Sequence, residues 1–587
     1  MTRLSLPLVL AVLFIAPLLR ADLSLPHFFS DHMVLQRDRD AAIWGEAAPG
    51  AGVTVTFKGA TVVVEAGPDG TWRAKVPTGE ADAAGAPLVV SSGEEEVVIS
   101  DVLVGEVWFA SGQSNMVFTM NRVEEYAGLV AESDHPALRM FNAPQVTAVD
   151  PRDDIEGSWT AASPETVPGY SAVAFFFARK LHLDLGVPVG VIKSAWGGKP
   201  VETFTSREAL LTLPGTKALV EAAIARDEAF DEASAMAAYE ENLSRWKEAI
   251  AGWRELTAAE KEKKRPPRRP AVPKRALDTE GQPGVLFNSM IHPFAGYDIQ
   301  GAIWYQGEGN AKVGAVPYDQ TLPLLIHDWR DRWGDAFSFY FVQLANFRAP
   351  TTDPGDRDPW PLLQDRMRLI LETTPKTGMA VTNDIGEADD IHPKNKKDVG
   401  ERLALWALAR DYGRDELVYS GPLFAGHEKQ GGAILVSFDH AGEGLKSRDG
   451  GPLQRFEIAG PDKVWHWAEA AIEGKHTVRV SCEDVPDPVA VRYAWAANPE
   501  GANLVNSAGL PASVFRTDDW NDVTDPRALA ALEKETRRRE LAGAIQALRA
   551  RRDAHDRGSE EFRAISEEMK AKMEAFRALS EERKAGR

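Results

Sequence analysis

The sequence predicts an α/β protein in which helices cover a mostly parallel sheet and small β units flank that sheet. Nearly continuous apolar runs such as 102–110 alternate with helical stretches, which is typical of strands buried on both faces. Short β-prone runs separated by Gly and Pro precede and follow this central part. The chain has 587 residues, enough for three or four units of ordinary domain size.

The first 21 residues have the composition of a secretory signal peptide. Arg3 precedes an apolar run over 4–19, which is shorter than the roughly 20 residues of a membrane span. Cleavage near Ala21 would give a secreted or periplasmic protein with no membrane segment. An uncleaved anchor is the alternative, because Leu19 is larger than a cleavage site prefers. The single cysteine, Cys482, excludes an intramolecular disulfide framework and fits a bacterial envelope.

Residues 22–100 are expected to form an N-terminal β-sandwich. The strand candidates follow one another at nearly regular spacing, with Pro68-Asp69-Gly70 as a turn signal between two of them. The candidates are 53–57, 61–64, 72–76, 88–91 and 96–100.

Residues 101–416 are expected to form the central α/β domain. Its strand candidates are 102–110, 189–194, 299–305, 337–344 and 377–382, and its helix candidates include 172–185, 322–333 and 360–373. A helical insertion over 206–281 interrupts this alternation. The insertion carries a basic, proline-rich loop over 261–275 that lacks the aromatic residues of a nucleic-acid site, so we interpret it as an exposed spacer.

Residues 417–525 return to β patterning and should form a C-terminal β domain that includes Cys482 in its packing. Residues 526–587 should form a charged helix or a pair of helices. The whole chain has a formal net charge of -20, which would repel a phosphate backbone and argues against nucleic acid as a partner. The mildly basic tail could pack against the acidic body or against a second subunit of a homo-oligomer.

Small polar residues follow three of the predicted strands, and the carboxyl ends of such strands are where ligands bind in open α/β sheets. Ser114 follows the strand 102–110 within Gly-Gln-Ser-Asn-Met and could be a nucleophile. Taken alone, such a serine is more often a helix cap. The segment is not a Gly-x-Ser-x-Gly elbow, because Met116 stands at the second Gly position.

Two further loops could stabilise a negative oxygen. Gln306 and Asn310 follow the strand 299–305 and could offer side-chain amides, although such amides often only bond the local backbone. Gly198 lies in a Trp-Gly-Gly segment, and its N–H group could be a second donor.

His392 is the candidate general base, because an imidazole can take a hydroxyl proton when a carboxylate orients its other nitrogen. Asp390, Asp389 and Asp384 precede it on one loop, and Pro393 restricts it to extended conformations. A surface ion pair is the structural alternative for such a histidine.

Together these segments resemble the SGNH hydrolase superfamily and, more narrowly, sialate O-acetylesterases and related carbohydrate acetyl esterases. The motifs are Gly-Gln-Ser-Asn-Met at 112–116, Trp-Gly-Gly at 196–198, Trp-Tyr-Gln-Gly-Glu at 304–308 and Asp-Ile-His-Pro at 390–393. The resemblance implies an SGNH-type (flavodoxin-like) sheet and hydrolysis of O-acetylated sugars, with no metal or other cofactor.

The resemblance also implies a role for each motif residue. Ser114 would be the nucleophile and His392 the base. The N–H groups of Ser114 and Gly198 would form the oxyanion hole, together with the side chain of either Gln306 or Asn310. The superfamily spacing Asp-x-x-His selects Asp389, whereas the Asp-Ile-His motif favours Asp390, and Asp384 is held in reserve.

Two other functions are compatible with the sequence. A glycosidase could use Glu308 and Asp384 as paired carboxylates. A non-catalytic carbohydrate-binding protein could use the β units and some of the 16 Trp residues. The glycan is also open: sialic acid would need a cation, such as Lys199 or Arg348, whereas a neutral polysaccharide such as acetylated xylan would not.

Overall fold

The computed structural model describes residues 23–520, except 124–125, 130–132, 258–259, 262–263 and 313, and residues 526–585, except 554 and 556–558. The expected signal peptide over 1–21 lies outside the described residues. Within them, no helix combines the length and apolar character that a membrane crossing requires.

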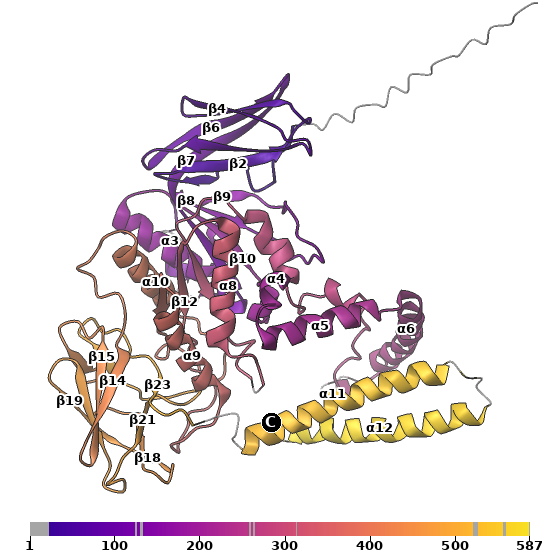
Figure 1. Ribbon diagram of the computed structural model, residues 1–587, viewed down its shortest axis with the longest axis vertical. Coiled ribbons are helices and arrows are strands. Elements are labelled where there is room, and N and C mark those ends of the chain that lie inside the picture. The colour runs from indigo at the N-terminus through magenta and orange to yellow at the C-terminus, as the bar shows by residue number, and fades with distance from the viewer. Residues whose placement is uncertain are drawn as a thin grey trace, which may run out of the picture.

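The chain is a mixed α/β protein whose main sheet contains parallel and antiparallel strands (Figure 1). The strand order through the centre is β13-β12-β11-β7-β10-β8-β9, and only the edge pair β8–β9 is antiparallel. In that order the strands span Thr377–Ala380, Ser338–Val342, Gly301–Tyr305, Glu95–Gly112, Val189–Ala195, His135–Asn142 and Trp159–Ala162.

Helices cover both faces of this sheet, as the near-continuous apolar strands predict. Neighbouring residues of β7 point to opposite faces: the Trp108 ring contacts Phe177 of α3, and the Phe109 ring contacts Trp329 of α8. Helix α3 (Ala172–Leu185) packs on α10 (Lys396–Arg410), and α8 (Tyr318–Trp333) packs on α9 (Pro359–Thr373).

The strand order has its topological switch point at β7. Without the edge strands β8 and β9, the five parallel strands follow the order 2-1-3-4-5. The connections therefore run in opposite directions on the two sides of β7, and ligands bind at such a point, outside the carboxyl ends of the strands. This is the end of β7 at which Ser114 lies.

The N-terminal β unit shares β7 with the main sheet. Strand β7 runs without a break through residue 101, where the sequence predicts a domain boundary. Asp101, at this position, has a left-handed φ of 54°, and its Oδ2 accepts a hydrogen bond of 2.8 Å from Arg139. The other strands of the unit are β1 (Val34–Gln36), β2 (Asp40–Glu46), β3 (Gly52–Phe57), β4 (Ala60–Glu65), β5 (Thr71–Pro77) and β6 (Asp82–Ser92).

The expected helical insertion contains α4 (Arg207–Leu210), α5 (Pro214–Glu228) and α6 (Glu232–Arg254), and its residues 264–275 form no helix or strand. No residue of α6 is buried. Trp246 and Trp253 of α6 donate indole hydrogen bonds of 2.9 Å to carbonyl groups of the basic loop. The loop therefore lies along the insertion.

The C-terminal β unit has a hydrophobic core of its own, separate from the core shared by the main sheet and the N-terminal unit. Two four-stranded antiparallel sheets contribute to it, β14-β15-β20-β19 and β18-β17-β21-β23, with β16 and β22 as a further pair. In chain order, β14 to β23 span Leu423–Gln430, Ala433–Asp439, Leu445–Ser447, Phe456–Ala459, Trp465–Trp467, Glu469–Glu473, Thr477–Ser481, Ala490–Tyr493, Leu504–Asn506 and Phe515–Arg516. Cys482 packs against this core, as expected.

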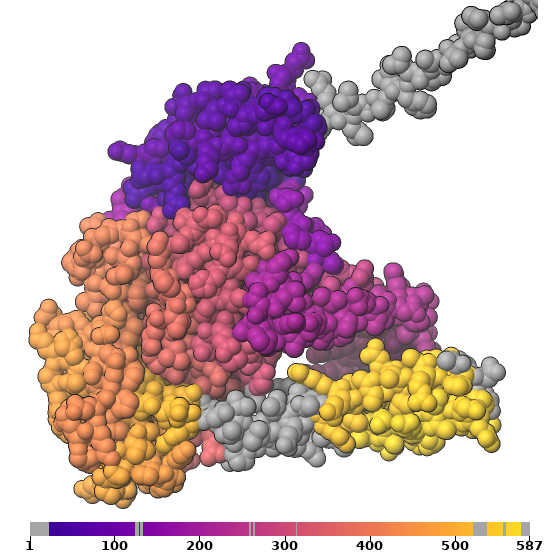
Figure 2. Space-filling model, viewed as in Figure 1, coloured from indigo at the N-terminus to yellow at the C-terminus, as the bar shows by residue number. Residues whose placement is uncertain are grey.

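The tail forms two helices, α11 (Pro526–Asp553) and α12 (Glu560–Ala585), which pack against each other. Among the described residues of this pair, the buried apolar side chains belong to neither of the two large cores. These side chains are Leu541, Ile545, Leu548 and Ile565. Figure 2 shows the pair as a yellow arm that projects from the body, below the insertion in this view.

Candidate active site

Ser114 lies where β7 ends against β11. A Cβ at Gly112 would lie only 2.2 Å from the carbonyl oxygen of Tyr305, and the φ of Gly112 is 132°, so glycine permits this close approach. Ser114 is the first residue of the short helix α1 (Ser114–Val117) and is partly exposed. Its hydroxyl does not cap the helix, because the cap position belongs to Gln113.

The side chains of Ser114 and His392 meet although 278 residues separate them: Oγ lies 2.8 Å from Nε2. The His392 side chain is 29% exposed. Burial is the main cause that lowers the pKa of His392 below its ordinary value of 6.5; the charges of Lys396 and Arg122 lower it further, and Asp390 opposes them. A neutral imidazole can accept the proton of the serine hydroxyl.

The three aspartates before His392 have different surroundings. The Oδ1 of Asp390 accepts a hydrogen bond of 2.9 Å from the His392 backbone N–H and lies 3.4 Å from Nδ1. Asp389 is exposed and makes no hydrogen bond or ion pair with any residue that the structure describes. Asp384 accepts two hydrogen bonds from Arg402, of 2.6 and 2.9 Å. The structure therefore brings Asp390 to the histidine and directs Asp384 elsewhere.

The Trp-Gly-Gly loop passes directly beside Ser114. Trp196 donates its backbone N–H to the Gly112 carbonyl at 3.1 Å, and a Cβ at Gly197 would lie 3.2 Å from the Cβ of Ser114. Gly198 has a φ of 70°. Among the described residues, the backbone N–H groups of Ser114 and Gly198 have no acceptor. Both are therefore available to a negative oxygen.

Gln306 and Asn310 lie at the same edge of the sheet but face the protein. Gln306 is fully buried, and its Nε2 lies within 3.2 Å of three protein acceptors, on Gln113, Lys199 and Asn310. The amide of Asn310 accepts a hydrogen bond from the Val201 N–H at 3.0 Å and donates to Glu202. In this conformation both side chains join the β11 loop to the loop after β10.

The structure adds three polar residues that the sequence did not assign to this site. Asn115 donates to Glu308 at 2.5 Å and accepts from the ammonium group of Lys396 at 2.5 Å. The sequence predicts for Glu308 only a place in a glycosidase pair, and it predicts no role for Asn115 or Lys396. Asn115 directly follows Ser114 and Lys396 lies four residues after His392, whereas Glu308 is distant in sequence from both.

The two cations considered for a sugar carboxylate are engaged elsewhere. Lys199 lies 3.2 Å from Glu280, and Arg348 forms an ion pair with Asp358. By contrast, Arg122 is exposed, stacks 4.2 Å above the ring centre of Phe118 and forms no ion pair within the described residues. Its charge also reaches His392.

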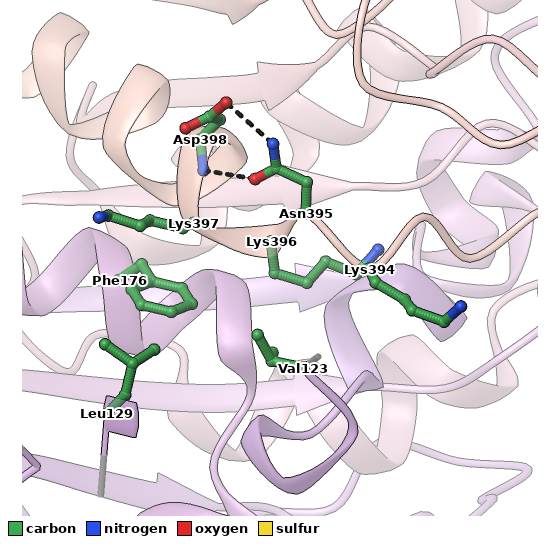
Figure 3. Close-up of a pocket in the computed structure, with 8 residues that line it drawn as sticks. All are labelled: Val123, Leu129, Phe176, Lys394, Asn395, Lys396, Lys397 and Asp398. Atoms are coloured by element: carbon green, nitrogen blue, oxygen red, sulfur yellow. Dashed lines mark hydrogen bonds between the residues drawn. The ribbon is translucent and has the colours of Figure 1, made fainter. Parts of the chain in front are cut away.

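A pocket of about 320 Å³ adjoins the N-terminus of α10. Figure 3 shows Asn395 bonded to Asp398 at this end of the helix, with Lys394 and Lys397 pointing in opposite directions. Lys396 borders the same pocket and also contacts Asn115. The pocket and the serine site therefore share one residue.

The described residues contain one group of three possible metal ligands, and it does not belong to the serine site. The ligand atoms of His466, Cys482 and Asp484 lie within 4.8 Å of one another in the C-terminal β unit.

Three comparisons with known proteins were informative in different ways. No family model matches the chain. The crystal structure of a carbohydrate acetylesterase from Xanthomonas citri is similar, with 35% identity, a TM-score of 0.70 and coverage of 85% of this chain and 100% of that chain. Sialate O-acetylesterase of Mus musculus is 29% identical over 83% of this chain and 93% of its own length. The Homo sapiens enzyme of that name is 27% identical over 83% of this chain and 91% of its own length.

Proposed function

The chain belongs to the family of carbohydrate acetylesterases related to sialate O-acetylesterase, and on this premise we propose that Ser114 is the nucleophile and His392 the general base of its reaction. The activity is the hydrolysis of O-acetyl esters on carbohydrates. The proposal includes an SGNH-type catalytic domain, which the strand order and the four motif loops support.

In the first half of the proposed reaction, Nε2 of His392 takes the proton of the Ser114 hydroxyl while Oγ attacks the acetyl carbonyl. The tetrahedral intermediate collapses, the bond from the acetyl carbon to the sugar oxygen breaks, and the imidazolium returns the proton to that oxygen. In the second half, water loses a proton to His392 and attacks the acetyl-serine. Acetate leaves, and the proton returns to Oγ.

We assign the developing oxyanion to the N–H groups of Ser114 and Gly198, which have no acceptor in the described part of the chain. Gln306 and Asn310 hold the loops that present these groups, because their amides already bond the protein. Asp390 positions His392 through the hydrogen bond from the His392 backbone N–H, and its charge near Nδ1 stabilises the protonated imidazole.

The observation that carries the proposal is the 2.8 Å contact between Ser114 and His392, made by two loops that converge from opposite parts of the domain. Neither the glycosidase nor the binding-protein hypothesis gives this contact a role. The glycosidase hypothesis is further weakened because Asp384 is bonded to Arg402 and Glu308 to Asn115.

Substitution of the nucleophile tests the proposal. We expect Ser114→Ala to lower kcat for 4-nitrophenyl acetate by on the order of 10⁴–10⁶ while leaving the protein folded. Ser163→Ala is a matched control, because the Ser163 hydroxyl bonds Glu165 at the surface. Wild-type acetate release by the Ser114 variant would disprove the assignment, and new reducing ends without acetate release would indicate a glycosidase.

The glycan can be narrowed with a substrate panel. A sialic acid carboxylate needs a cation near His392, and Arg122 is an exposed cation without an ion pair in the described residues. Acetate release from 9-O-acetyl sialic acid should be compared with release from its methyl ester and from acetylated xylan. Preference for the free acid over its methyl ester would show recognition of the carboxylate, whereas equal rates on both and on xylan would favour a neutral polysaccharide.

A further inference from the structure

The side chain of Asn115 joins the two loops that carry the reacting groups. Asn115 directly follows Ser114, and its Nδ2 donates a hydrogen bond of 3.1 Å to the carbonyl oxygen of Ile391, the residue before His392. The same nitrogen donates to Glu308 at 2.5 Å, so both amide hydrogens are used. Asn115 is 1% exposed, and water therefore does not compete for these bonds.

The opposite charges of Lys396 and Glu308, at the two ends of the Asn115 side-chain amide, fix the orientation of that amide. The ammonium group of Lys396 donates to Oδ1 at 2.5 Å, and the carboxylate of Glu308 accepts from Nδ2. A reversed amide would place its NH₂ group against the ammonium and its oxygen against the carboxylate, and both contacts would be repulsive. Charge-assisted hydrogen bonds are also stronger than neutral ones.

Two aromatic rings also lie near the ammonium group of Lys396. Lys396 is fully buried, and its ammonium group lies 4.8 Å from the ring centre of Phe118 and 5.5 Å from that of Tyr305. Burial lowers the pKa of Lys396 to about 7, whereas the charge of Glu308 opposes that effect. The ammonium form of Lys396 is therefore costly at this position.

The ionised carboxylate of Glu308 is also unfavourable in its buried position. Its Oε2 is buried and has no hydrogen-bond partner in the described part of the chain, and burial raises the pKa of its carboxyl group. Apolar side chains of similar volume often stabilise a fold as well as buried charges do, or better. Two such groups at opposite ends of one amide therefore suggest a purpose other than stability.

We propose that Lys396 and Glu308 are positioning residues: they lock the Asn115 amide, and through the Ile391 carbonyl they hold His392 within hydrogen-bonding distance of Ser114. The inference rests on the proposed function, because it takes Ser114 and His392 as the reacting pair. Neither Lys396 nor Glu308 is assigned a contact with substrate. Their loss should therefore change kcat rather than KM.

The first test is Glu308→Gln, which keeps the shape and removes the charge. We expect kcat for 4-nitrophenyl acetate to fall about 10–100-fold, the cost of a small misplacement of reacting groups, with KM little changed. The melting temperature should fall, because the buried ammonium group of Lys396 then loses its opposing charge, so kcat is measured well below the melting temperature, on folded enzyme. A residue that only supported the fold would leave the kcat of the folded enzyme unchanged.

Glu457→Gln is the matched control. Glu457 is a buried glutamate in β17 of the C-terminal β unit, where burial raises its pKa to about 8 and the Gly355 N–H donates to it at 2.9 Å. The substitution is chemically the same but lies outside the main sheet. We expect wild-type kcat and KM from this variant.

Lys396→Met is the second test. The pH profile of this variant separates the effect of Lys396 on the position of His392 from the effect of its charge on the pKa of His392. The charged groups that act on His392 are Asp390, Lys396 and Arg122. Removing the Lys396 charge should raise the pKa of His392 and move the acidic limb of kcat/KM to higher pH. In Glu308→Gln that limb should move less than in Lys396→Met, because the lysine is kept, while kcat on the pH plateau should fall in both variants.

The outcomes distinguish this inference from the proposed function. If Ser114→Ala abolishes turnover but Glu308→Gln and Lys396→Met keep the wild-type plateau kcat, the positioning role is wrong and the proposed function stands. If Ser114→Ala retains activity, the proposed function fails first. Should Lys396→Met not fold, kcat of Glu308→Gln relative to Glu457→Gln decides the question.

Discussion

At the scale of single residues, the protonation of His392 depends on opposing neighbours. Burial and two cations favour the neutral imidazole, and Asp390 favours the charged one. The carboxylate lies 3.4 Å from Nδ1, beyond the range of a good hydrogen bond, so its influence is mainly electrostatic. This balance determines the pH range in which the base can accept a proton.

The balance gives a prediction for the pH dependence. The base must be unprotonated and its pKa lies below 6.5, so kcat/KM should rise with pH through a midpoint below 6.5. Asp390→Asn removes the charge that raises the pKa of His392, and the acidic limb of the kcat/KM profile should move to still lower pH. kcat should fall by less than the roughly 10⁴-fold loss that follows when a carboxylate bonded closely to the base is removed.

Asp389→Asn is the control for this experiment, because Asp389 is exposed and lacks partners among the described residues. Its pH profile for 4-nitrophenyl acetate should match that of the wild type. A shifted limb in Asp389→Asn and an unshifted one in Asp390→Asn would reverse the assignment of the two aspartates.

The sequence was sufficient to predict some residues of the candidate site and not others. Ser114 and His392 lie in short motifs at strand ends, so a local pattern identified them. Lys396 lies among Lys394 and Lys397, which are exposed, and nothing local separates one buried lysine from a charged surface run. Its partner Asn115 is 281 residues away, and such a contact is set by the sheet order rather than by sequence spacing.

At the scale of elements, β7 has the largest part in forming the site. It pairs in parallel with β10 on one side and with β11 on the other, and it ends at the tight approach between Gly112 and Tyr305. The Gln113 N–H donates to the same Tyr305 carbonyl at 2.9 Å. This pairing fixes the direction in which the chain enters Ser114.

Gly112→Ala should therefore damage both the fold and the site. An added Cβ would clash with the Tyr305 carbonyl, and alanine would also be strained at a φ of 132°. We expect the free energy of unfolding to fall by at least the roughly 1–3 kcal/mol of a strained backbone position, with kcat reduced as well. Urea denaturation and 4-nitrophenyl acetate turnover would measure the two effects.

Gly52→Ala in β3 is the matched control, because no atom lies within 4 Å of its added Cβ and its φ is not positive. Its stability and turnover should match those of the wild type. A stable, active Gly112→Ala variant would show that the approach of β7 to β11 tolerates a side chain.

The elements also show where sequence patterns end. The change from alternating residues to the apolar run near residue 101 suggested a boundary, because half-buried and fully buried strands differ in pattern. The structure has one strand there, and what changes is its surroundings: before Asp101 it faces a small β unit, and after it the strand lies between helix layers. The hydrophobic pattern of a strand indicates which of its residues are buried. A change in burial alone does not indicate where a strand ends.

At the scale of the whole molecule, the chain contains two large cores and a separate pair of helices. One core joins the N-terminal unit to the main sheet, and the other fills the C-terminal β unit. Residues 527–587 hold 16 Lys and Arg against 12 Asp and Glu, a net of +4, whereas the whole chain has -20. The helix pair thus differs from the body in charge as well as in packing.

Deletion of residues 521–587 tests whether the helix pair matters to the enzyme. The side chains of both large cores remain in such a variant, so we expect wild-type kcat/KM and an unchanged melting temperature for the body. Light scattering would give the mass of the particle with and without the helices. A smaller assembly after deletion would show that the helix pair joins subunits, and a loss of stability would show that it packs on the body.

The shared strand β7 restricts how this enzyme can be recombined with its relatives. A chimera that exchanged only the N-terminal unit would need a junction near Asp101, inside a strand whose next eleven residues lead to Gly112, two residues before Ser114. Exchange of that unit alone would therefore alter a strand that continues into the main sheet. The C-terminal β unit, with its own core, is the piece that could be transferred as a whole.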